Sequence, residues 1–263
     1  MNNPLDALQA AFRPAPAASA GGRLLVAGAT GVLGAEVLRR LVGSTRFSHA
    51  EVLATEPMRT GLSGVSIRVV PDGPVTSWPA VMLAGGTGVV MFGPPRLYYD
   101  RERALWTPRP EDLAGLAQWF RRCGLNTLVV VLPHQQGRLP DALKRGLATL
   151  DEHAVAAAGF ERVLFVRSAQ KAQATTGLSW PRRLAAWMLS TLSYMVPATE
   201  QPARPTKIAQ FIDAALGMLP AGTHVVPPEV LWQASQSGGR QPGSSRIHSV
   251  VQAWLNKQHS SQP

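Results

Sequence analysis

Short apolar runs rich in valine alternate with helical patterns between residues 23 and 170. Strands of a parallel sheet are buried on both faces and read as near-continuous apolar runs, so this alternation is typical of repeated β-α units. The pattern predicts an α/β fold with a doubly wound parallel sheet. The six expected strands cover residues 24–27, 51–55, 66–70, 88–92, 127–132 and 162–166.

Three helices are expected between these strands. In residues 35–41, Val37, Leu38 and Leu41 share one helical face. The segment 110–120 begins with proline and acidic residues and is followed by a glycine, which are the usual start and stop signals of a helix. A third helix is expected from residue 140 to about 158, ending before a glycine.

The two ends of the chain differ from this middle part. Residues 1–22 contain prolines and an Ala/Gly/Ser run, which predicts a flexible leader. Residues 171–234 are expected to form a small helical lobe, with helices at 180–196 and 205–219 and a short strand at 223–226. The apolar helix 180–196 could lie on a membrane surface, but its sparse polar face favours a lid over a substrate cleft. Residues 235–263 are rich in Ser, Gln and Gly and predict a polar flexible tail, with a helical turn or two at 247–255.

Composition narrows the functional classes only in part. The 263 residues are 45% hydrophobic, enough for one substantial core. No apolar stretch approaches the roughly 20 residues of a transmembrane helix, and a cytoplasmic protein is the expectation. The single cysteine, Cys123, excludes an internal disulfide and a cysteine-based metal cluster. The net charge of +10 favours an anionic ligand. A dinucleotide, a nucleic acid and an acidic membrane surface would each fit, and the charge does not distinguish among them. No nucleic-acid-binding signature is present.

The most informative motif is a glycine turn that follows the first apolar run. Residues 24–34 read Leu-Leu-Val-Ala-Gly-Ala-Thr-Gly-Val-Leu-Gly. Gly28 suits a tight exit from a strand, Gly31 permits close approach of a pyrophosphate, and Gly34 permits close packing of helix on sheet. The free N–H groups at the helix N-terminus would face the phosphates. Residues 23–170 are therefore expected to be a dinucleotide-binding domain.

This turn, the order of strands and the late helical segment together resemble the atypical branch of the short-chain dehydrogenase/reductase superfamily, including its nitrogen-metabolite-regulator-like group. The resemblance covers residues 23–233 and extends to the segment 204–215, Arg-Pro-Thr-Lys-Ile-Ala-Gln-Phe-Ile-Asp-Ala-Ala. It implies a Rossmann-like sheet that binds NAD or NADP, with substrate above the carboxyl ends of the strands. It also makes a homodimer the expectation.

The resemblance implies specific cofactor contacts. A carboxylate at the tip of the second strand, here Glu56, would accept the ribose hydroxyls and favour NAD, whereas Arg59 could pair with the 2′-phosphate of NADP. NAD is slightly favoured. Asp72 follows the third strand, and Phe92 and Gly93 follow the fourth, where the family places the adenine and the inner ribose. The pyrophosphate is expected to lie against Gly28, Thr30, Gly31, Val32, Leu33 and Gly34.

The proton-transfer pair of the family is missing. Its reductases use a tyrosine with a lysine four residues later, but the residues four positions after Tyr98, Tyr99 and Tyr194 are Glu, Arg and Ala. His134, beyond the fifth strand, and Tyr98 and Tyr99, on the loop after the fourth, are the candidate substitutes. No metal-binding cluster is evident, and Lys144 is expected to be a solvated helix residue.

Two functions therefore stay open. The chain could be a cofactor-binding or regulatory protein that senses NAD(P). It could instead be an active oxidoreductase or isomerase with a non-standard acid, because hydride transfer itself is chemistry of the cofactor. The substrate or regulatory partner is not identified by the sequence.

Overall fold

A computed structural model of the protein describes residues 22–83, 85–96, 99–135, 147–170, 203–236 and 243–259. Nearly all of the expected leader and the whole of the expected helix 180–196 lie outside these residues. Tyr98 and Lys144 also lie outside them.

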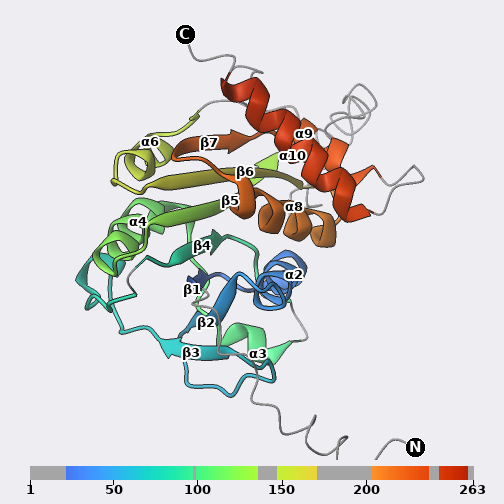
Figure 1. Ribbon diagram of the computed structural model, residues 1–263. Helices are drawn as coiled ribbons and strands as arrows, with labels where there is room; N and C mark the ends of the chain where they lie inside the picture. Colours follow the sequence, from blue (N-terminus) through green and yellow to red (C-terminus); the bar gives the residue numbers. More distant parts are fainter. Residues whose placement is uncertain are drawn as a thin grey trace, which may run out of the picture.

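One parallel sheet forms the centre of the molecule (Figure 1). Its seven strands have the order β3-β2-β1-β4-β5-β6-β7, and every neighbouring pair is parallel. The direction of strand order reverses at β1, as in doubly wound dinucleotide-binding sheets, so the predicted α/β fold class is confirmed. The strands are β1 (Gly22–Ala27), β2 (Phe47–Ala54), β3 (Val65–Val69), β4 (Thr87–Met91), β5 (Thr127–Gln135), β6 (Arg162–Gln170) and β7 (Gly222–Val226).

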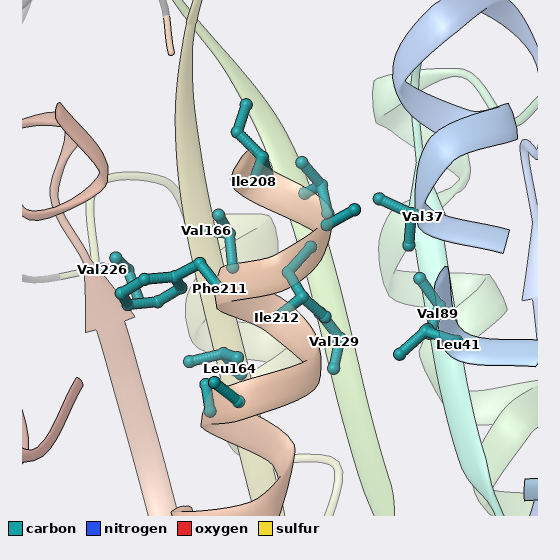
Figure 2. Packing of buried hydrophobic residues seen from close by; sticks show 14 of the residues in the cluster. Val37, Leu41, Val89, Val129, Leu164, Val166, Ile208, Phe211, Ile212 and Val226 are labelled. Atoms are coloured by element: carbon teal, nitrogen blue, oxygen red, sulfur yellow. The ribbon is translucent and has the colours of Figure 1, made fainter. Parts of the chain in front are cut away.

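Helices cover both faces of this sheet. One face carries α2 (Gly31–Val42), α8 (Pro205–Met218), α9 (Pro228–Ser235) and α10 (Gly243–His259). The other carries α4 (Leu113–Arg122), α6 (Leu150–Ala156) and the short 3-10 turns η1 (Val75–Ser77) and η2 (Pro110–Asp112). Figure 2 shows the first face, where Ile208 and Phe211 of α8 lie close to Leu164 and Val166 of β6.

The C-terminal part of the chain differs from the expectation of a flexible tail. Residues 243–259 form α10, a helix of 17 residues. Ile247, Val251, Trp254 and Leu255 are buried in the same core cluster as α8. Their spacing of four, three and one puts them on one helical face, a stripe that the surrounding Ser and Gln residues obscured. Because α8 and α9 pack on the sheet and β7 is one of its strands, the described part of the expected lobe belongs to the main body.

The helix expected at 140–158 is shorter in its described part, which is α6. Residues 147–149 are not helical. Thr149 has an extended backbone with φ of −128°, and its side chain accepts the N–H of Glu152 at 3.2 Å, so it acts as the N-cap. A capping threonine starts the helix where apolar periodicity alone did not show a boundary. Within the described part of the chain, no helix is both long and apolar enough to span a bilayer.

Candidate functional site

The turn between β1 and α2 has the backbone that the three glycines predicted. Gly28 and Gly31 have φ of 75° and 69°, in the left-handed region. A Cβ on Gly34 would lie 2.7 Å from the carbonyl carbon of Ala29, so α2 packs against the turn more closely than a side chain allows. The turn therefore places the first amide of α2, that of Gly31, beyond the carboxyl end of β1.

The loop after β4 lies across this turn. Thr30 is fully buried, and its hydroxyl donates to the carbonyl of Gly93. The Thr30 Oγ1 also lies 3.4 Å from the Oγ1 of Thr107. A Cβ on Gly31 would lie 2.9 Å from the carbonyl oxygen of Pro94. Two residues that the resemblance assigned to the cofactor, Thr30 and Gly93, thus meet, and the loop 92–96 covers Gly31.

A carboxylate from a third segment binds the first amide of α2. Glu102 lies on α3 (Asp100–Arg103) and is only 7% exposed. Its Oε2 accepts the N–H of Gly31 at 3.0 Å and the N–H of Arg96 at 2.9 Å. Its Oε1 accepts Nε of Arg96 at 2.7 Å and is also bonded to the Nη2. The N-terminus of α2 is therefore already paired with an anion, and that anion belongs to the protein.

Electrostatics keeps this carboxylate charged. Burial by itself raises the pKa of Glu102, but the hydrogen bonds from the Arg96 side chain and from the Arg96 and Gly31 amides outweigh it, so the net pKa lies below the ordinary value. The hydrogen bond to Glu102 in turn raises the pKa of Arg96. The Cζ of Arg96 also lies 3.8 Å from the ring centroid of Tyr99, in a cation–π contact. The site is thus an internal ion pair on a helix N-terminus.

This ion pair predicts a pH-dependent contribution to stability. A carboxylate whose folded-state pKa is depressed contributes stability above its unfolded pKa of about 4.3, and the contribution is lost as pH falls below that value. Glu102→Gln should therefore cost about 1–3 kcal/mol at pH 7, and this cost should shrink steadily below about pH 5. Urea unfolding of both proteins at several pH values measures it, and a cost independent of pH would contradict this electrostatic account.

The segment that carries Glu102 is tied to the ends of β1 and β2. We call residues 99–107 the strap. The N–H of Trp106 donates to Leu53 at 3.0 Å, and the carbonyl of Trp106 accepts the N–H of Gly28 at 3.1 Å. The carbonyl of Ala104 accepts the N–H of Thr55 at 2.8 Å. The strap therefore lies between the carboxyl ends of two neighbouring strands, where the resemblance places the nucleoside half of a cofactor.

The other predicted cofactor residues lie around this centre without joining it. Glu56 and Arg59 are exposed beyond the end of β2, and Asp72 is exposed beyond β3. Val32 is 53% exposed, so it borders solvent at the first turn of α2. Leu33 and Phe92 are half-buried and pack against the two core clusters instead.

Two of the catalytic candidates can also be placed. His134 pairs in register with Ala169 near the carboxyl ends of β5 and β6. Tyr99 is 52% exposed and lies against Arg96. Sequence reasoning missed Glu102 and Arg96. Nothing in the run Asp-Arg-Glu-Arg at 100–103 distinguishes its buried glutamate from the exposed charges beside it.

Comparisons with solved structures return matches of low sequence identity. No protein-family model matches the chain, and no curated protein matches it. A triphenylmethane reductase of a Citrobacter species, complexed with NADP(H), is similar with 13% identity, 92% coverage of each chain and a TM-score of 0.43.

Two further solved structures are comparable. A Rossmann-fold NAD(P)-binding family protein of Shigella flexneri has 13% identity, covers 84% of this chain and 98% of its own, and has a TM-score of 0.42. A uronate dehydrogenase of Agrobacterium tumefaciens has 12% identity, coverage of 93% and 91%, and a TM-score of 0.43. Similarity of this degree assigns no substrate or activity to this chain.

Proposed function

We propose that the protein binds NAD or NADP at the β1–α2 turn and acts as a cofactor-binding or regulatory protein related to short-chain reductases. One observation carries this proposal: the amide of Gly31, at the N-terminus of α2, binds a carboxylate. An amide that binds one anion in this position has the chemistry to bind another, and helix N-termini after a glycine turn bind phosphates in this way.

The hydrogen-bond donors and the positive charge at the turn are of the types that bind a diphosphate. A phosphate oxygen at the position of the Glu102 Oε2 would receive the N–H groups of Gly31 and Arg96, which Glu102 now receives. The guanidinium of Arg96 suits two oxygens of one phosphate. When bound, the nicotinamide cofactor supplies hydride transfer. The protein supplies the amides, the cation and the shape of the turn.

A binding role is favoured over catalysis by the sequence. The chain has no Tyr-x-x-x-Lys pair, and loss of a general acid removes roughly 10²- to 10⁴-fold of rate. The choice between NAD and NADP rests on Glu56 and Arg59, both exposed beyond β2. Glu56 favours the unmodified ribose of NAD, and Arg59 favours the 2′-phosphate of NADP.

Titration of the purified protein with NADH and NADPH by calorimetry tests this proposal. We expect saturable binding with a dissociation constant below about 1 mM, which corresponds to roughly 4 kcal/mol of binding free energy. Glu56→Ala should weaken NADH more than NADPH, and Arg59→Ala should do the opposite, because each removes the group that recognises one ribose. Absence of binding at millimolar concentration in both wild type and Glu102→Gln would overturn the proposal.

A further inference from the structure

We propose that Glu102 and the strap are a built-in competitor for the dinucleotide, so that a diphosphate binds the turn only after Glu102 has left it. This inference rests on the proposed function and adds a regulatory step to it. The closed structure described above is then the unliganded state. Binding exchanges an internal anion for an external one.

The competition follows from shared donors. Gly31 has a single N–H, and it already points at the Glu102 Oε2 at 3.0 Å. The main-chain N–H and the guanidinium of Arg96 are bonded to the same carboxylate. A phosphate that used these donors would need the space that the carboxylate fills, and two anions in one buried position repel. Glu102 and a diphosphate therefore cannot be bound together.

The strap also occupies the position expected for the nucleoside half of the cofactor. Its backbone bonds to Gly28, Leu53 and Thr55 place residues 104–106 across the carboxyl ends of β1 and β2. Of the four residues of α3, only Glu102 is buried. This buried side chain is held by Arg96 and by the amide of Gly31. Release of Glu102 would loosen the helix while the turn keeps its glycine-determined shape.

After the exchange, Arg96 would still be paired with an anion. Arg96, freed from Glu102, would face the incoming diphosphate with the same guanidinium fork. The closed state costs affinity, because the apparent dissociation constant is the intrinsic one divided by the fraction of open molecules. A variant that opens the strap should therefore bind tighter, and one that locks it should bind more weakly.

The first experiment weakens the competitor. Glu102→Gln keeps the shape but places an amide NH₂ where Arg96 needs an acceptor. Calorimetry with NADH and with inorganic pyrophosphate should give at least about tenfold tighter binding for this variant, as expected when a closed state that reduces apparent affinity is removed. Glu111→Gln, the same change at a carboxylate on η2 that is 65% exposed, is the matched control and should bind like wild type.

The second experiment locks the strap. Ala54 and Leu105 form an antiparallel bridge flanked by the bonds Trp106 to Leu53 and Thr55 to Ala104. Residues opposed in this way have Cα atoms about 4.5 Å apart, within the range that a disulfide spans. The double variant Ala54→Cys, Leu105→Cys, oxidised with oxidised glutathione, should bind NADH at least about tenfold more weakly than the same protein reduced with dithiothreitol. Each single variant should be insensitive to this treatment.

The outcomes separate the two proposals. Binding by wild type, with no gain in Glu102→Gln and no loss in the oxidised double variant, would overturn the competitor and leave the proposed function intact. Absence of binding in every protein, reduced or oxidised, would overturn the proposed function and the competitor with it. If Glu102→Gln fails to fold, the disulfide variant alone decides.

Hydrogen exchange tests release of the strap in the wild-type protein. NADH should increase the exchange rate of the Thr55 and Trp106 amides, and unchanged exchange on saturation would contradict release of the strap.

Discussion

Gly28→Ala should lower the free energy of unfolding by about 2–5 kcal/mol, the sum of a left-handed backbone and an overfilled core position. The φ of Gly28 is 75°, and an added Cβ would lie 1.9 Å from the carbonyl oxygen of Met91 and 3.0 Å from Cδ of Pro108. Met91 ends β4, so its carbonyl cannot move without disturbing the sheet. Urea unfolding monitored by tryptophan fluorescence measures the loss.

Gly159→Ala is the matched control for this prediction. Gly159 has a φ of 80°, but an added Cβ would meet nothing within 4 Å. Its substitution should therefore cost only the backbone strain, about 1–2 kcal/mol. Equal losses of unfolding free energy at the two positions would show that the close contact between an added Cβ at Gly28 and the carbonyl of Met91 costs no stability.

Arg167→Met should also lower the free energy of unfolding by about 3–5 kcal/mol, because it leaves a buried carboxylate without its cation. Arg167 of β6 donates to the Oε2 of Glu152 on α6 at 2.8 Å, and the two side chains are 4% and 3% exposed. The same Oε2 accepts the N–H of Ala148 at 2.7 Å. This pair ties the start of α6 to the sheet.

Two further variants test the explanation for Arg167. Replacement of both partners, Glu152→Leu with Arg167→Met, should recover most of the lost stability, because no isolated charge then stays buried. Arg39→Met removes an arginine that is 67% exposed and paired with Glu36, and should cost less than about 1 kcal/mol. A double variant as unstable as Arg167→Met would show that packing around the arginine, rather than charge, determines the loss.

The two glycine-turn proposals have a common physical basis. A turn shaped for close approach of an anion leaves an amide that must find a partner, since a buried N–H without an acceptor is costly. In this protein the partner is Glu102. The same donor that makes the turn suitable for a phosphate thus explains why the protein holds its own carboxylate there.

The sequence by itself determined those features that depend on near neighbours in the chain. Each predicted strand is present because runs such as 24–27 are apolar enough to be buried on both faces of a sheet. The turn at Gly28, Gly31 and Gly34 was also readable, because its shape depends on a few consecutive residues and on the absence of their Cβ atoms.

Only the tertiary structure decided what lies on that turn and what completes the core. Glu102 is 71 positions from Gly31, and its burial depends on how the strap meets the ends of β1 and β2. The apolar stripe of α10 is buried because it packs against apolar side chains of α8 and the sheet. Local sequence patterns predict which side chains of a segment can be buried together. The partner of a single charge, or of one helical face, depends on contacts between segments that are distant in the sequence.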